Sequence, residues 1–308
     1  MPIKIVEGLP VAEHLRSERV SLIETGRALT QDIRPLKILI LNLMPKKEET
    51  ELQLLRLLGN TPLQIDVDFM YMNSHLSKNT PKSYLQKYYY HYDEIKNERF
   101  DGLIITGAPV EHLEFSEVDY SKELNQVMKW SETHVFSRFY ICWAAQYALN
   151  YYFDIEKIPL SEKLFGIFQY KNNIPSHKML RGFDEYYHVP QSRHTRVDYE
   201  RIEKIPELIK LTEHPEYGPD ILITQDQRDI FVFGHLEYDR NTLNNEYQRD
   251  LARGDDIQMP KNYFPTNDPT ERPIFNWKSH AYILYNNWLN QTYQNTPYDL
   301  DELVTLKR

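Results

Sequence analysis

The sequence predicts an α/β fold, with a mostly parallel β-sheet flanked by helices and a short antiparallel extension. Three observations predict it. Apolar runs typical of buried strands alternate with stretches of helical period in the first half of the 308-residue chain. The spacing of these segments suits βαβ units, in which neighbouring strands run parallel. In the second half, short apolar runs are joined by turn-like segments, which favours antiparallel pairing.

The first half of the chain repeats a strand-then-helix pattern up to residue 153. Its first strand, 37–43, is a continuous apolar run, as expected of a strand buried on both faces. Leu52, Leu55 and Leu58 then recur at helical spacing. We predict strands at 37–43, 64–72, 100–106 and 136–141, and helices at 48–58, 84–97, 120–134 and 144–153.

The second half of the chain has a different pattern, with short apolar runs joined by turn-like segments. Here we predict strands at 208–211, 221–224 and 230–233, helices at 238–253 and 279–293, and a proline-rich loop at 260–273. Residues 1–34 are interpreted as an N-terminal arm with one short helix near residues 11–16. No linker-like or low-complexity stretch divides the chain. The prediction is one domain, 1–308, in which the arm precedes an α/β core and C-terminal helices at 35–308.

Composition narrows the classes of function. The net charge of −9 and the pI of about 5.7 argue against a general affinity for nucleic acids or anionic membranes, which requires a basic face. The single cysteine, Cys142, excludes an intramolecular disulfide and favours a reducing compartment. No segment has the pattern of a signal peptide or the roughly 20 apolar residues of a membrane span. We therefore expect a soluble cytoplasmic protein.

Cys142 lies where a predicted strand runs directly into a predicted helix. Such a turn would expose the sulfur at the carboxyl edge of the sheet, where α/β proteins bind ligands. A helix N-terminus favours the reactive thiolate, and its free N–H groups can hold an oxyanion. A lone cysteine is often an inert core residue, so the local pattern alone leaves both interpretations open.

His235 and Glu237 could supply a base for that cysteine. They follow the predicted strand 230–233 two residues apart, which places both on one side of an extended segment. A nucleophilic cysteine needs a base, and the base needs an acceptor that orients it. The chain has 11 histidines, however, so an ordinary surface histidine beside an acid is the alternative interpretation.

Lys46 and Lys47 follow the first buried strand and so belong to the same edge of the sheet. A lysine or a backbone N–H there could steady a tetrahedral intermediate or a phosphate. Two solvated lysines at the start of a helix are the equal alternative. The sequence contains no glycine-rich phosphate loop, and its histidine spacing does not suit zinc, so we expect no bound metal.

Several longer blocks of sequence resemble the homoserine O-acyltransferases of methionine biosynthesis. The longest block is QDIRPLKILILNLMPKK at 31–47. The others are LLRLLGNTPLQ at 54–64, TGAPVE at 106–111, ICW at 141–143, SRHT at 192–195, GHLEYD at 234–239 and SHA at 279–281. Together they span nearly the whole chain. The resemblance implies a fold like that of the class I glutamine amidotransferases, with a cysteine in a sharp strand-to-helix turn.

The same resemblance implies ping-pong acyl transfer. Cys142 would take the acyl group from an acyl-CoA as a thioester and pass it to the γ-hydroxyl of L-homoserine. His235 would serve as the general base, and Glu237 would orient His235. The backbone of the loop that carries Lys46 or Lys47, together with Trp143, would form the oxyanion hole.

The resemblance also implies which residues recognise the two substrates. The homoserine-binding positions of the family fall on Lys163, Ser192 and Arg249, and a guanidinium can bind a carboxylate through two hydrogen bonds. The residue after TGAPV is glycine in succinyl-transferring members and glutamate in acetyl-transferring members. Here it is Glu111, whose charge would repel the second carboxylate of a succinyl group. We therefore predict acetyl-CoA as the donor.

Four positions depart from the family pattern. Ala144 stands where many members have glycine, and Tyr147 replaces a small residue. Gln191 stands where histidine is usual, and Leu236 replaces a proline between the proposed base and its partner. Both lie close to the inferred acceptor site, so L-serine remains an alternative acceptor, and succinyl-CoA an alternative donor. The resemblance also implies a homodimer that uses acetyl-CoA as a co-substrate and holds no cofactor permanently.

Two other classes of protein would share these features. A glutamine-hydrolysing amidotransferase would have the same fold and triad, but it would need an ammonia-accepting domain or partner, and the chain shows no second domain. A binding protein on the same scaffold would not need Cys142, His235 and Glu237 together. A test for glutaminase activity separates the first alternative from acyl transfer.

Overall fold

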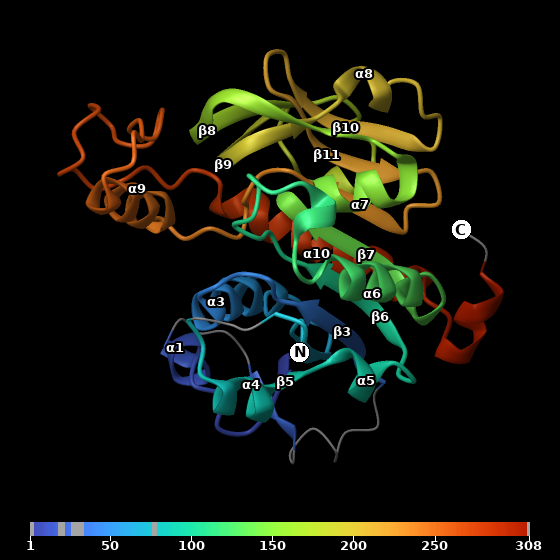
Figure 1. The fold of residues 1–308 in the computed structure, drawn as a ribbon. Helices are drawn as coiled ribbons and strands as arrows, with labels where there is room; N and C mark the ends of the chain where they lie inside the picture. Colours follow the sequence, from blue (N-terminus) through green and yellow to red (C-terminus); the bar gives the residue numbers. More distant parts are fainter. Residues whose placement is uncertain (1–2, 18–21, 26–33, 76–78, 307–308) are drawn as a thin grey trace.

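The computed structural model describes residues 3–17, 22–25, 34–75 and 79–306, which fold around a 12-stranded sheet (Figure 1). The strands are β1 (Ile3–Ile5), β2 (Leu22–Glu24), β3 (Leu36–Leu41), β4 (Ile65–Met70), β5 (Tyr89–Tyr90), β6 (Phe100–Ile105), β7 (Val135–Ile141), β8 (Lys157–Asn172), β9 (Tyr186–Val197), β10 (Leu208–His214), β11 (Gly218–Thr224) and β12 (Asp229–Val232). Along the sheet their order is β2-β1-β4-β3-β6-β7-β12-β11-β10-β8-β9, with β5 beside β4. The predicted α/β class is therefore confirmed.

Helices cover both faces of the sheet. They are α1 (Ala12–Ser17), α3 (Lys47–Leu58), α4 (Lys82–Tyr88), α5 (Tyr92–Ile95), α6 (Ser121–His134), α7 (Trp143–Phe153), α8 (Tyr199–Ile202), α9 (Thr242–Arg253) and α10 (Lys278–Asn295), with short 3-10 turns at Phe115–Glu117, Lys178–Leu180 and Leu300–Thr305. The buried side chains of α3 and α10 belong to one apolar cluster, and those of α6 and α7 belong to the other. The described part of the chain contains no helix that is both long enough and apolar enough to span a membrane.

The parallel half of the sheet runs from β2 to β12, and every neighbouring pair in it is parallel. Its central strands are buried on both faces, as continuous apolar runs predict. In the pairing of β6, β7 and β12, Ile105 lies beside Tyr140, and Val232 lies beside Ile141. The residues that follow these three strands therefore emerge together at one edge.

The antiparallel half comprises β11, β10, β8 and β9 (Figure 1, yellow-green to gold). It is larger than the short extension that the sequence predicts. Its main component is the β8–β9 hairpin, which was not predicted. β8 mixes exposed and half-buried residues over its first seven positions and contains a register shift between Pro159 and Leu164, so its only apolar run is the short stretch 164–168.

Three boundaries differ from the sequence-based predictions. The arm at 1–34 contributes β1 and β2 to the parallel sheet, and Ile3, Ile5 and Leu15 are core residues. The helix predicted at 84–97 is two short helices separated by β5. Helix α9 begins at Thr242 rather than at 238, because the preceding residues form a turn in which the Tyr238 N–H donates to the carbonyl of His235 and the Asp239 N–H donates to the Thr242 hydroxyl.

Candidate active site

Cys142 occupies a strained turn between β7 and α7. Its backbone angles are φ 50° and ψ −112°, a conformation that non-glycine residues rarely adopt. Its N–H donates to the carbonyl of Val232 (2.7 Å), while its own carbonyl accepts the N–H groups of Ala145 (3.0 Å) and Gln146 (3.2 Å). The turn is thus fixed on both sides, and it places the sulfur at the edge where the strands end.

His235 and Glu237 lie on the segment that follows β12, next to β7. The distance from His235 Nδ1 to Glu237 Oε1 is 2.6 Å, and both side chains are buried. The ring of Tyr238 stacks on the imidazole at a centroid distance of 4.1 Å. The His235 N–H donates to the carbonyl of Pro190 on β9 (2.8 Å). The imidazole is therefore held by a carboxylate, a ring and its own backbone.

The electrostatic environment of His235 favours its protonated, positively charged form. Burial opposes the charging of His235, but the attraction of Cys142 and Glu237 and the hydrogen bonds to both outweigh it. The pKa of His235 is consequently raised well above its ordinary value. A protonated imidazole between a sulfur and a carboxylate is the arrangement that stabilises a thiolate nucleophile.

Two glycines lie beside the catalytic candidates, and one of them is required by space. A Cβ on Gly107, in the loop after β6, would lie 3.5 Å from both Cys142 Cβ and His235 Cε1, which is ordinary van der Waals contact. This distance shows how near the loop lies to the sulfur and the ring. A Cβ on Gly234 would lie 2.1 Å from a methyl group of Val189, so only glycine fits before His235.

Glu111 is the third acidic or nucleophilic group at this edge. One carboxylate oxygen lies 3.9 Å from Cys142 Sγ, and the other accepts the backbone N–H of His194 (2.9 Å). Burial raises the pKa of Glu111, and the His194 N–H, His235, Arg193 and a nearby lysine oppose that shift. The predicted donor-selecting residue thus lies directly beside the predicted nucleophile.

Lys163, Ser192 and Arg249 come together around two acids that the sequence analysis missed. Glu246 Oε2 accepts the Ser192 hydroxyl (2.6 Å) and lies 3.5 Å from Lys163 Nζ. Asp250 accepts Arg249 Nε (2.6 Å) and lies 3.7 Å from the Lys163 ammonium. The spacing of Glu246 and Asp250, one turn apart on α9, is the signal that could have found them.

Tyr238 joins this charged cluster to the proposed base. Its hydroxyl donates to Glu246 Oε1 (3.0 Å), and its ring stacks on His235. The cluster therefore lies next to the histidine rather than on a remote surface. It offers both cations and anions, which are the groups that recognise a zwitterionic amino acid.

The two lysines of the loop after β3 have different environments. The Lys46 side chain is 67% exposed and pairs with Glu49 at 3.6 Å. Lys47 is buried and donates to the carbonyl of Asn42, and burial lowers its pKa to about 8 while Glu51 opposes the shift. Only Lys47 therefore points into the molecule. No contact of either lysine with Cys142 is observed within the described residues.

Trp143, the first residue of α7, contributes its backbone rather than its indole to this edge. The indole is fully buried and packs on Phe115, Tyr120 and Tyr147, with centroid distances of 5.9, 6.2 and 5.1 Å. The first N–H groups of a helix have no partner within the helix. The N–H of Trp143 is therefore suited to an oxyanion formed on Cys142.

Gln191 and Leu236, two of the four departures from the family pattern, belong to the buried scaffold. The Gln191 amide donates to Tyr170 (3.1 Å) and Asp220 (3.2 Å) and accepts Arg193 Nε (3.0 Å). Leu236 is 2% exposed and belongs to the apolar core. The amide of Gln191 is thus fully engaged by protein groups.

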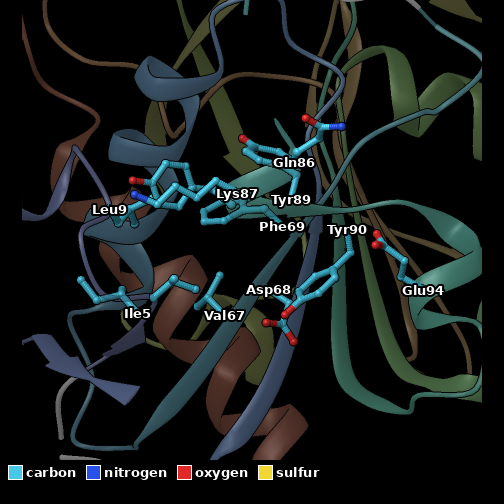
Figure 2. Close-up of a pocket in the computed structure, with 12 residues that line it drawn as sticks. Ile5, Leu9, Val67, Asp68, Phe69, Gln86, Lys87, Tyr89, Tyr90 and Glu94 are labelled. Carbon is cyan, nitrogen blue, oxygen red and sulfur yellow. The ribbon is translucent and has the colours of Figure 1, made fainter. Parts of the chain in front are cut away.

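A separate hollow lies between β1, β4 and β5, at the other end of the sheet (Figure 2). Figure 2 shows the Asp68 carboxylate beside the ring of Tyr90. The residues that line this hollow include none of the Cys142 site. The hollow is therefore separate from the candidate active site.

Comparisons with known proteins identify the family. The family described as homoserine O-succinyltransferase matches residues 2–298. The relatives include a homoserine O-acetyltransferase of Acetivibrio thermocellus, 53% identical over 304 residues (98% of this chain, 100% of that protein). Those of Brevibacillus brevis (52%; 98% and 99%) and Clostridium novyi (54%; 97% and 99%) have the same name.

Solved structures support the fold at much lower identity. A glutamine amidotransferase from Thermotoga maritima has a TM-score of 0.57 and is 11% identical, covering 85% of this chain and 100% of that one. A glutamine amidotransferase from Methylobacillus flagellatus has a TM-score of 0.51 and 10% identity, with coverage of 84% and 95%. The predicted amidotransferase-like fold is thereby confirmed.

Proposed function

The chain belongs to the homoserine O-succinyltransferase family, and we propose that it transfers an acetyl group from acetyl-CoA to the γ-hydroxyl of L-homoserine. Full-length relatives named homoserine O-acetyltransferase support this activity. The single observation that carries the choice of donor is the carboxylate of Glu111, 3.9 Å from Cys142 Sγ.

In the first half of the proposed reaction, the Cys142 thiolate attacks the carbonyl carbon of acetyl-CoA. The negative charge that develops on the carbonyl oxygen is stabilised by the N–H of Trp143 and by backbone of the adjoining loops. The tetrahedral intermediate expels the CoA sulfur, which takes the proton from His235. The products are free CoA and an acetyl thioester on Cys142, with His235 neutral.

In the second half, neutral His235 removes the proton from the homoserine hydroxyl as the oxygen attacks the thioester. Glu237 holds Nδ1–H, which fixes the ring and stabilises its positive charge when the proton arrives. Collapse of the second tetrahedral intermediate releases O-acetyl-L-homoserine and restores the thiolate–imidazolium pair. The balance of protons closes without any permanently bound cofactor or metal.

Recognition of the acceptor is assigned to the cluster on β8, β9 and α9. Arg249 and Lys163 carry the positive charges that a substrate carboxylate needs. Glu246 and Asp250 carry the negative charges that a substrate ammonium needs. These four groups pair with one another in the absence of a substrate, so binding exchanges protein ion pairs for substrate ion pairs.

Recognition of the donor is assigned to Glu111. A succinyl group would bring a second carboxylate into the space that the Glu111 carboxylate occupies. Like charges close together in a buried site repel strongly, whereas an acetyl group ends in a small neutral methyl. The same arrangement therefore accepts acetyl and rejects succinyl.

Mass spectrometry of the intact protein tests the proposal. The full-length protein is exposed to acetyl-CoA or succinyl-CoA without an acceptor, and then L-homoserine or L-serine is added. We expect one acetyl adduct on Cys142 that homoserine discharges faster than serine does. The absence of any adduct would contradict the mechanism, and a preferred succinyl adduct would contradict the donor.

A Glu111→Gly variant tests the donor separately, with Glu114→Gln as the control. Both residues lie on the same loop, but Glu114 is exposed. Glu111→Gly should gain succinyl transfer, and the control should not. Two further properties remain predictions: a homodimer, which light scattering of the full chain would test, and a cytoplasmic location, which fractionation would test.

A further inference from the structure

The loop after β6 holds a buried carboxylate within an exposed stretch of chain. Glu111 is 9% exposed, yet the following residues His112, Leu113 and Glu114 are all exposed. Within the loop, the Leu113 N–H donates to the carbonyl of Val110 (3.0 Å), which only closes a local turn. Something outside the loop must hold this turn against the site.

Lys157, the first residue of β8, provides that attachment. Its ammonium donates to the carbonyl of Glu111 (2.9 Å) and also to the carbonyl of Leu113. It lies over the ring of Phe115, 5.2 Å from the centroid. An ammonium has three N–H donors, so two of them bind carbonyls of one turn while an aromatic face covers the cation.

The charge of Lys157 is not used in an ion pair. Among residues 3–17, 22–25, 34–75 and 79–306, no carboxylate lies within 4.0 Å of its Nζ, although the protein has many acidic groups. Hydrogen bonds from a charged donor are roughly twice as strong as neutral ones. The Lys157 ammonium therefore binds the main-chain carbonyls of the loop rather than a carboxylate.

The β8–β9 hairpin holds Glu111 at a second point. The N–H of His194 on β9 donates to Glu111 Oε2 (2.9 Å), while Lys157 on β8 holds the main chain. One contact fixes the carboxylate and the other fixes the backbone that carries it. Both contacts oppose movement of the carboxylate away from Cys142 Sγ, from which it lies 3.9 Å.

We propose that Lys157 is a positioning residue for donor selection, which fixes the loop so that the Glu111 carboxylate stays beside Cys142 Sγ. This inference rests on the proposed function and on the role of Glu111 in it. When the two hydrogen bonds are lost, the loop can move outward and leave room for a larger anionic acyl group. The discrimination between donors then falls, whereas acetyl transfer, which needs less room, is affected less.

The test compares Lys157→Met, Lys157→Arg and the wild type as full-length proteins, with Lys171→Met as the matched control. Lys171 is an exposed residue at the other end of the same strand. The quantity measured is the ratio of kcat/KM for acetyl-CoA to kcat/KM for succinyl-CoA. We expect Lys157→Met to lower this ratio about tenfold, and Lys157→Arg, which keeps charged donors, to restore most of it.

Hydrogen–deuterium exchange gives a readout that does not depend on activity. Amides of residues 107–115 should exchange faster in Lys157→Met than in Lys171→Met or the wild type. Unchanged exchange there would refute the attachment. An unchanged donor ratio, or an equal loss with both donors, would refute the role in selection. If the wild type transferred neither acyl group, the proposed function itself would fail, and donor selection with it.

Discussion

The parallel and antiparallel halves of the sheet contribute differently to the proposed site. In the parallel half, Cys142 and His235 follow neighbouring strands, and the pairing of Val232 with Ile141 brings them together. In the antiparallel half, Lys163 and Ser192 project from the β8–β9 hairpin toward α9. In the proposed reaction, the parallel half carries the groups that make and break bonds, together with Glu111, which selects the donor. The β8–β9 hairpin and α9 carry the groups that bind the acceptor. The two tasks can therefore be separated by substitution.

The largest effect is expected from Cys142→Ala. Because the proposed reaction passes through a thioester on this sulfur, both half-reactions should be lost, with a decrease in kcat of about 10⁴-fold or more. Intact-mass analysis should show no acyl adduct. A variant that still acetylates homoserine would place the nucleophile elsewhere, and retained binding of homoserine by calorimetry would confirm that the acceptor-binding groups are intact.

Glu237→Gln should have the next largest effect. The amide keeps the shape but no longer stabilises the imidazolium, so we expect kcat to fall about 10²- to 10³-fold. The Glu237 carboxylate raises the pKa of His235, so its removal lowers that pKa. The ionised pair persists only below the His235 pKa, and the alkaline limb of kcat/KM for acetyl-CoA should consequently move to lower pH. A limb that stays in place would argue against the orienting role.

Arg249→Met should affect only the binding of the acceptor. We expect KM for homoserine to rise about 10- to 100-fold, because a charged partner of the substrate carboxylate is lost. The rate of acetyl-adduct formation without an acceptor should remain as in the wild type. Arg253→Met is the control, since Arg253 lies on the same helix but is 64% exposed and 4.0 Å from Asp250. A slower acylation step in Arg249→Met would show that the two halves are coupled.

The smallest effect concerns Lys47, in the parallel half. Burial lowers its pKa to about 8, and the pKa of an unfolded lysine is about 10.5. Between these values the unfolded state binds more protons, so the free energy of unfolding should rise with pH. Relative to Lys47→Met, the wild type should gain about 1–2 kcal/mol from about pH 8 to about pH 9.5, measured by urea unfolding. An identical pH dependence would contradict the lowered pKa.

The same substitution decides what Lys47 does. If acylation of Cys142 proceeds normally in Lys47→Met, the lysine only supports the loop after β3 through its bond to Asn42. If acylation stops while the protein remains folded, Lys47 takes part in the acylation of Cys142. The exposed Lys46 provides the comparison, because Lys46→Met should change neither property.

The sequence predicted the parallel half well and the antiparallel half poorly, for a physical reason. β3 and β7 are buried on both faces, so their apolar runs are visible in the sequence without knowledge of their neighbours. The turn at Cys142 and the His235–Glu237 pair are local in sequence and were found. The first part of β8 mixes exposed and half-buried residues, and its pairing with β9 is interrupted. The buried stretch that follows, 164–168, is short and contains a glycine, so the hairpin was not recognised.

Recognition groups were partly found and partly missed. Lys163, Ser192 and Arg249 were identified only through the family resemblance, because nothing local distinguishes them. Glu246 and Asp250 are ordinary acids on a polar helix until the fold brings the hairpin beside them. Lys157 was missed for the same reason, since its partners are backbone carbonyls 46 and 44 residues away.

Three consecutive residues of β9 bind groups in three different parts of the molecule. Ser192 directs its hydroxyl to Glu246, Arg193 directs its guanidinium into the core toward Gln191, and His194 offers its N–H to Glu111. Because successive side chains of a strand alternate between its faces, an insertion or deletion of one residue before Ser192 would turn the Ser192 and Arg193 side chains to opposite faces and shift the N–H that binds Glu111. We therefore expect that variants with altered specificity must substitute residues of β9 without changing their number.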